Sequence, residues 1–179
     1  FGLFCARFDP LGVPSGTPEG VRQAARQAAR ARVDELLAST TLGAEETEIM
    51  RWALAFVESV ERTSFFLPIK TAMCFRLASS FFKRPDIESL PFGVFFIVGR
   101  RFHGFHVRFK DIARGGIRIV RSASMDDWLR NSDTLFEECF NLAYTQNKKN
   151  KDIPEGGSKG VILPAPGAKS EEAARAFQQ

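Results

Sequence analysis

Hydrophobic residues recur at two different spacings along this chain, and the spacing changes near residue 63. Residues 19–38 and 44–62 favour helices and place apolar side chains three or four positions apart, which predicts two amphipathic helices. The predicted inward-facing positions are Val21, Ala25, Ala28, Ala29, Val33, Leu36 and Leu37 in the first helix, and Ile49, Trp52, Leu54, Phe56, Val57 and Val60 in the second. Proline and glycine interrupt residues 1–18, so this part is expected to be an irregular lead-in.

Beyond residue 63, short runs of Phe, Val and Ile are separated by glycine, proline or charged residues, which predicts strands. The predicted strands cover residues 71–77, 92–98, 105–109, 117–120 and 161–163. Residues 92–98 are apolar at both alternating sets of positions, so this strand is expected to be central and covered on both faces. Residues 105–110 alternate apolar and charged or polar side chains, as a strand with one exposed face does.

A further helix is predicted after the strands. Ser124 followed by Asp127 forms a capping box, and an apolar stripe continues to about Tyr144. A polar, basic break follows at 147–151, and residues 169–179 begin another helix. The predicted fold is α/β or α+β, with an irregular and helical segment at 1–62 and a mixed sheet flanked by helices at 63–179.

Composition narrows the class of protein. The chain is 44% hydrophobic with 18 Phe, enough for a core, and it has no apolar run near the ~20 residues that a membrane span needs. Three scattered cysteines do not make a disulfide framework and favour a reducing compartment. The whole net charge of +4 lies in residues 100–159, which hold 12 Lys or Arg and 8 Asp or Glu. This surplus favours an anionic partner: a carboxylate, a phosphate or nucleic acid.

Two glycine pairs lie beside cations: Arg114-Gly115-Gly116-Ile117-Arg118 and Gly156-Gly157-Ser158-Lys159-Gly160. Glycine lets a ligand approach main-chain N–H groups while the neighbouring cation meets its charge, although such pairs also mark plain turns between strands. Lys159 could serve as a base if its pKa were depressed, or bind a carboxylate if it stays charged. The phosphate-loop and dinucleotide-binding glycine patterns are both absent. His103 and His106 have no third ligand nearby, so no metal site is expected.

These motifs, read in their full context, resemble the fungal-type, large NAD-dependent glutamate dehydrogenases of the Glu/Leu/Phe/Val dehydrogenase superfamily. The resemblance lies in the run from Phe102 to Val120, in Asn141-Leu142-Ala143-Tyr144-Thr145-Gln146, and in the stretch from Lys149 to Gly160. It spans roughly residues 63 to 163. It implies oxidative deamination of L-glutamate to 2-oxoglutarate and ammonia, with hydride transfer to NAD.

The resemblance also implies site residues. The lysine of the family's K-G-G-x-R motif is Arg114 here, which still suits a substrate carboxylate. Gly115 and Gly116 complete that substrate-binding motif, and Lys149, or Lys148 beside it, corresponds to the second substrate lysine. Lys159 corresponds to the catalytic lysine. The chain is then expected to be a partial substrate-binding and dimerisation domain, cut at both ends, with the Rossmann domain and its bound NAD outside it.

Such a fragment is expected to be inactive alone, whereas its parent is an enzyme that forms a homo-oligomer in mitochondria or the cytoplasm. No nucleic acid and no membrane are expected as partners. Two alternatives stay open. One is a non-catalytic module that binds anions or nucleic acid, with Phe105 and Phe109 on an exposed face as in RNA-binding sheets. The other is a degenerate regulatory subunit.

Overall fold

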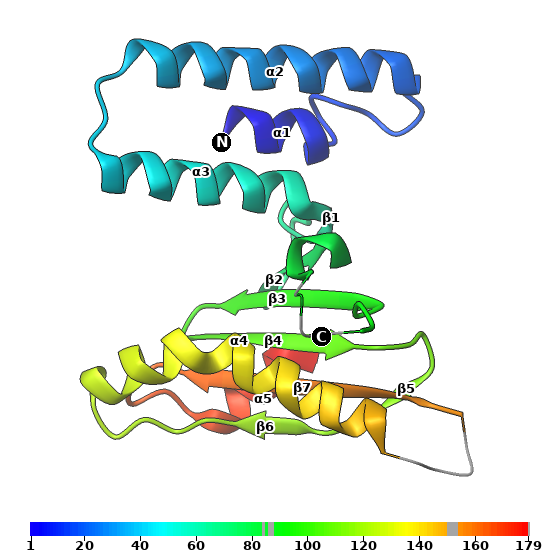
Figure 1. Ribbon diagram of the computed structural model, residues 1–179, viewed down its shortest axis with the longest axis vertical. Coiled ribbons are helices and arrows are strands. Elements are labelled where there is room, and N and C mark those ends of the chain that lie inside the picture. Colours follow the sequence, from blue (N-terminus) through cyan, green and yellow to red (C-terminus); the bar gives the residue numbers. More distant parts are fainter. Residues whose placement is uncertain (84, 86–87, 150–153, 179) are drawn as a thin grey trace. The chain divides into compact units, whose positions relative to one another are not determined.

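The computed structural model describes residues 1–179 except 84, 86–87, 150–153 and 179. The chain divides into two compact units, Phe1–Arg62 and Thr63–Gln179. The first unit contains three helices, α1 (Gly2–Phe8), α2 (Glu19–Ser39) and α3 (Ala44–Ser59), which Figure 1 draws in blue to cyan. Both long helices were predicted from the 3.6-residue pattern and are confirmed.

Two predictions for the first unit are wrong in part. Residues 1–18 are not irregular throughout, because α1 occupies the stretch before Pro10 and buries Leu3 and Phe4. The second predicted helix ends at Ser59 instead of residue 62, and β1 (Val60–Thr63) follows. The β-branched Val60 is fully buried there, and its carbonyl accepts a hydrogen bond from Arg7 Nη2 at 2.7 Å.

The predicted inward-facing stripes of α2 and α3 are covered only in part, and most of their other positions are half-buried. Val21, Leu36, Ile49 and Trp52 are each more than half exposed, and α2 buries no residue. Helical spacing predicts which side chains share a face, but burial needs a partner surface. Three helices in a unit of 62 residues supply too little of it.

The second unit is built on a mixed sheet, as predicted. Within residues 63–179 the strand order is β2-β3-β4-β7-β5, and β6 also pairs with β7. β2 (Ala72–Leu77), β3 (Gly93–Gly99), β4 (Phe102–Arg108) and β7 (Gly156–Pro164) are successive antiparallel neighbours. β5 (Ala113–Arg114) and β6 (Ile117–Ile119) both pair with β7 in parallel. A short 3₁₀ helix, η1 (Ser79–Phe82), follows β2.

α4 (Met125–Lys148) crosses one face of this sheet, in front of β4 and β7 in Figure 1. Ser124 is its N-cap, and its Oγ accepts the Asp127 N–H at 3.1 Å, which confirms the predicted start of this helix. The core between helix and sheet consists of Val94, Val107, Phe109, Leu135, Cys139, Phe140, Ala143, Val161 and Leu163. A smaller core with α5 (Ser170–Gln178) covers the opposite face, around Ile97, Phe102, Ile162 and Ala173.

The predicted strands are confirmed with boundary corrections to β4 and β7, and the predicted end of the helix that follows them is also corrected. β4 begins at Phe102 instead of residue 105, and β7 begins at Gly156 instead of residue 161, because pairing with β4 and β5 draws the glycine motif into the sheet. α4 continues to Lys148 instead of Tyr144 and so includes the start of the predicted break, of which residues 150 and 151 lie outside the described residues. β3 is central between β2 and β4, as expected. None of the described helices is long and apolar enough to cross a membrane.

Candidate substrate site at the paired glycine motifs

The two glycine motifs lie side by side in the sheet. Arg114 of β5 is paired with Gly157 of β7, and Ile117 of β6 is paired with Gly160. Gly115 and Gly116 connect β5 to β6, so they run beside Ser158 and Lys159. The Gly160 N–H donates to the Gly116 carbonyl at 3.2 Å. The sequence order of the motifs, separated by a long helix, did not reveal this parallel pairing.

Lys159 belongs to the face of β7 that α4 covers. Val161 and Leu163 pack in the core under α4, and side chains alternate along a strand, so Lys159 and Gly157 share that face. The contact of Gly157 with the backbone of α4 supports the same assignment. The Cys139 Sγ of α4 also lies 3.2 Å from the Lys159 carbonyl, to which it donates a hydrogen bond.

Arginines from the neighbouring strands flank Lys159 on this face. Arg114 is paired with Gly157, and Arg118 is paired with Val161, so they lie one strand away and two positions to either side of Lys159. The Nε atom of Arg118 contacts Glu138 of α4 at 2.8 Å, which places its side chain on the helix-covered face. Three cations therefore converge on one face around the two glycine motifs.

Arg114 is partly exposed and forms an ion pair with the carboxylate of Glu155 in the same chain. Its Nε atom lies 3.4 Å from Glu155 Oε2, with the two side chains 33% and 28% exposed. Such a half-exposed pair contributes on the order of 1 kcal/mol or less, so an incoming carboxylate can compete for the guanidinium. The sequence analysis did not single out Glu155, although its position next to the second glycine pair was the available signal.

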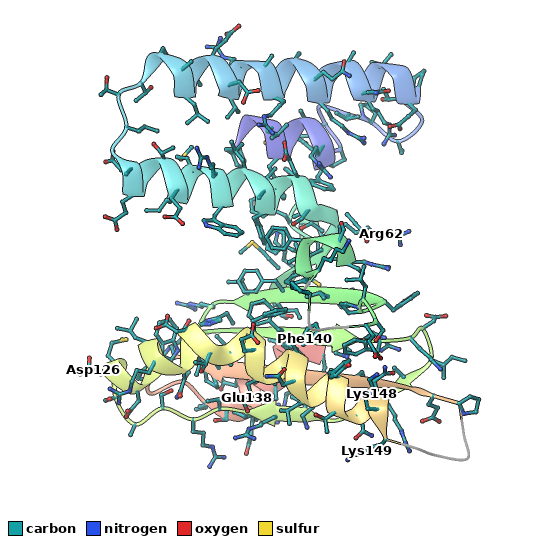
Figure 2. The ribbon with its side chains drawn as sticks, viewed as in Figure 1. Arg62, Asp126, Glu138, Phe140, Lys148 and Lys149 are labelled. Atoms are coloured by element: carbon teal, nitrogen blue, oxygen red, sulfur yellow. The ribbon has the colours of Figure 1, made fainter. Side chains whose placement is uncertain are left out.

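Lys148 and Lys149 lie at the C-terminal end of α4, beside the start of β7 (Figure 2). The Lys148 ammonium contacts Glu88 Oε2 at 3.0 Å and lies 5.3 Å from the centre of the Tyr144 ring. Hydrogen bonds to Glu88 and Tyr144 raise the pKa of Lys148 and hold it charged. Lys149 is the exposed C-cap residue, and among the described residues it makes no ion pair.

Asn147, which the sequence analysis did not single out as a site residue, links α4 to the second glycine motif. Its Oδ1 atom accepts the Gly157 N–H at 3.1 Å. A Cβ atom on Gly157 would lie 2.1 Å from the backbone nitrogen of Asn147 and 2.3 Å from the carbonyl oxygen of Ala143. Only glycine therefore permits this approach of β7 to α4.

The opposite face of the sheet is hollowed. A cavity of about 340 Å³ is lined by Gly115, Gly116, Ile117, Ser158, Gly160 and Phe177, among others. A larger cavity of about 670 Å³ shares His106, Arg108 and Phe177 with it. Neither cavity is lined by Arg114, Lys148, Lys149 or Lys159, so these hollows and the cation-rich face are separate surfaces.

The two histidines do not form a metal site together. The His103 Nε2 atom lies 3.1 Å from Ser132 Oγ of α4, whereas His106 packs beside Phe95 and lines the cavities on the other face. No group of three or more potential metal ligands occurs among the described residues. Burial raises the pKa of Cys139 to about 12, which removes it as a thiolate nucleophile at neutral pH.

The turn between β6 and α4 lacks the glycines of a dinucleotide-binding turn. β6, α4 and β7 form a parallel βαβ unit, but residues 120–124, between β6 and α4, contain no glycine. A pyrophosphate would lack the close backbone approach that it needs there. The aromatic platform expected of an RNA-binding sheet is also covered, since Phe105 and Phe109 pack beneath α4.

Comparison with known proteins agrees with the motifs. Residues 33–179 match the family "Bacterial NAD-glutamate dehydrogenase, catalytic domain", a match that begins within α2 and so extends N-terminal to the expected resemblance. The chain is 48% identical over 132 residues to glutamate dehydrogenase 2 of Dictyostelium discoideum, covering 72% of this chain and 13% of that protein. It is 46% identical over 133 residues to the NAD-specific glutamate dehydrogenase of Neurospora crassa, with 74% and 13% covered.

The NAD-specific glutamate dehydrogenase of Saccharomyces cerevisiae is 50% identical over 120 residues, which cover 66% of this chain and 11% of that protein. The chain thus spans little more than a tenth of the length of these relatives. The family match covers most of the chain and includes both glycine motifs and α4. The chain belongs to the family whose model is described as the catalytic domain of bacterial NAD-glutamate dehydrogenase.

Proposed function

We propose that this chain supplies a substrate half-site of an NAD-dependent glutamate dehydrogenase of the Glu/Leu/Phe/Val superfamily. The reaction is the oxidative deamination of L-glutamate to 2-oxoglutarate and ammonia, with hydride transfer to NAD. One observation carries the proposal: parallel pairing of β5 with β7 places Arg114 one strand away from Lys159 on the same face. A dicarboxylic amino acid needs two cationic contacts, and this face provides several.

Arg114 is the proposed receptor for one glutamate carboxylate. Its planar guanidinium can form two parallel N–H···O bonds with a carboxylate, in exchange for the weak pair with Glu155. Gly116 leaves the adjacent backbone open, so the substrate can lie against it, and Gly115 allows this segment to lie close to Ser158.

Lys149 is the proposed second substrate lysine. Lys148 is engaged by Glu88 and Tyr144, whereas Lys149 lies exposed at the end of α4. A carboxylate near the C-terminus of a helix faces the negative end of the helix dipole, so a lysine at this position offsets that repulsion. The structural difference between the two lysines favours Lys149.

Lys159 is the proposed catalytic residue. Its backbone is held on both sides by the sheet and from α4 by Cys139, which gives the side chain a fixed origin. Arg114 and Arg118 lie one strand away, two positions to either side of it along β7. A neutral Lys159 amine could take a proton from the water that attacks the imino acid, and the resulting ammonium would stabilise negative charge developing on oxygen.

NAD is proposed to bind a domain outside this chain, because the βαβ turn between β6 and α4 lacks the glycines that a dinucleotide requires. The isolated chain is accordingly expected to lack turnover. A homo-oligomer and a mitochondrial or cytoplasmic location are expectations for the whole enzyme.

The test is steady-state kinetics of the full-length enzyme that carries this sequence. Lys159→Ala should lower kcat by roughly a hundred-fold or more, as loss of a general base does. Lys169→Ala is the matched control, since Lys169 is 81% exposed and pairs only with its helical neighbour Glu172 in the described structure. A Lys159→Ala enzyme with a nearly normal kcat would exclude Lys159 from the proton-transfer role.

A further inference from the structure

The last turn of α4 and the first residues of β7 are joined by a contact that leaves almost no room. The Asn147 Oδ1 atom accepts the Gly157 N–H at 3.1 Å, and Gly157 lies against the backbone of Ala143 and Asn147. Asn147 is half-buried, in contrast to the exposed Lys148 and Lys149 that follow it. The contact therefore joins the last turn of α4 to the start of β7.

The same contact lies between the residues of the proposed site. Lys149 follows Asn147 by two residues, and Lys159 follows Gly157 by two residues. This hydrogen bond therefore links the end of the helix that carries Lys149 to the strand that carries Lys159. Helix ends fray readily, so the last turn of α4 needs such a side-chain bond to hold Lys149 at a constant position.

The body of α4 is anchored independently of Asn147. Leu135, Cys139, Phe140 and Ala143 are fully buried against the sheet. The loss of the Asn147 side chain should leave this core intact and release only the final turn. Its effect should then fall on the substrate lysine and not on the folding of the unit.

We infer that Asn147 is a positioning residue for glutamate binding, which holds Lys149 at a fixed distance from Lys159 through the backbone of Gly157. The inference rests on the proposed function. A side chain that only stabilised the fold would change melting temperature without changing KM. A positioning residue changes KM for glutamate while the melting temperature stays nearly constant.

The experiment compares Asn147→Ala with Asn141→Ala in the full-length enzyme, because Asn141 is an exposed asparagine on the same helix. Asn147→Ala should raise KM for glutamate about tenfold, as expected for loss of one well-placed hydrogen bond, with kcat changed by less than about threefold. Asn141→Ala should change neither. KM for NAD serves as an internal control and should be unchanged in both variants.

Asn147→Asp keeps an acceptor oxygen for the Gly157 N–H and tests the hydrogen bond itself. At high ionic strength, where the added charge is screened, its KM should return to within about threefold of the original enzyme under the same conditions. An Asn147→Ala enzyme with unchanged KM overturns the inference, as does a lowered melting temperature as its sole effect. If Lys159→Ala is inactive in the same preparation while Asn147→Ala behaves normally, the inference fails and the proposed function stands.

Discussion

Gly115 lies so close to Ser158 that a Cβ atom on Gly115 would be 1.6 Å from the Ser158 carbonyl oxygen. The neighbouring Gly116 has open space around its Cα, with nothing within 4 Å of the position of a Cβ atom. Two adjacent glycines of one motif therefore have different physical roles. Gly115 permits the close approach of the two motifs, whereas the absence of a side chain at Gly116 leaves backbone accessible.

The difference predicts opposite effects on stability. Gly115→Ala must push the β5–β6 connection away from β7, and we expect it to lower the free energy of unfolding by about 1–3 kcal/mol, as overpacking does. Gly116→Ala is the matched control and should leave the melting temperature nearly unchanged. Thermal unfolding followed by circular dichroism would measure both. Equal melting temperatures for the two variants would contradict the close approach.

Phe140 is a second stability test, in the core between α4 and the sheet. It is fully buried, stacks on Tyr144 and contacts the rings of Phe109 and Phe136. Phe140→Ala should lower the free energy of unfolding by about 3–5 kcal/mol through lost burial and the cavity left behind. Leu129 lies on the same helix but is 52% exposed, so Leu129→Ala should lower the free energy of unfolding far less. Urea unfolding of both variants distinguishes a packed core from a loosely covered sheet.

The His106 side chain should make the free energy of unfolding depend on pH. Burial, and then the positive charge of Arg108, lower the pKa of His106 from its ordinary 6.5 to about 4. Above pH 6.5 the ring is neutral in both folded and unfolded chains. Between pH 6.5 and 4 the unfolded chain binds the proton first, so stability is lost as the pH falls.

Removing this titration should flatten the acid side of the stability curve. We expect His106→Gln to lose less stability than the original protein between pH 7 and pH 5, as measured by urea unfolding at each pH. Burial also lowers the pKa of His103, which acts in the same direction and is common to both proteins. If the two proteins lose the same stability over this range, His106 is not buried as described.

Substitution of Arg114 should weaken the binding of glutamate. Arg114→Ala should raise KM for glutamate by roughly 10- to 100-fold with a smaller change in kcat, because a charge-assisted hydrogen bond contributes about 1.5–3 kcal/mol. Arg100→Ala is the control, since Arg100 is exposed at the turn between β3 and β4. Steady-state kinetics of the full-length enzyme measure both. A KM that did not change would assign the carboxylate to another cation.

Periodicity predicted the regular elements because their side chains have one clear partner surface. Short runs of Phe, Val and Ile located β2, β3 and β6 within one residue at each end, and the Ser124-Asp127 pattern located the start of α4. β1 and β5 were missed because each is too short to show a period, and glycine hid the first half of β7. Exposure of Trp52 and Ile49 was missed because spacing predicts a shared face but not a covering surface.

The candidate site was predicted only in its parts. The motifs identified Arg114, Lys148, Lys149 and Lys159 as residues, but the face that each occupies depends on strand register, which no local pattern encodes. Asn147 of α4 contacts Gly157 of β7, and Glu155 contacts Arg114 of the parallel strand β5. Such contacts follow from the fold and not from the spacing of residue types.

The central claim is that Arg114 and Lys159 surround the same glutamate. A crystal structure of the full-length enzyme with bound 2-oxoglutarate tests it most directly. We expect 2-oxoglutarate to bind on the α4-covered side of β7. One of its carboxylates should lie within about 3 Å of the Arg114 guanidinium, and the Lys159 ammonium should lie within reach of its keto group. A ligand bound in the cavities on the opposite face of the sheet, or contacting neither residue, would contradict it.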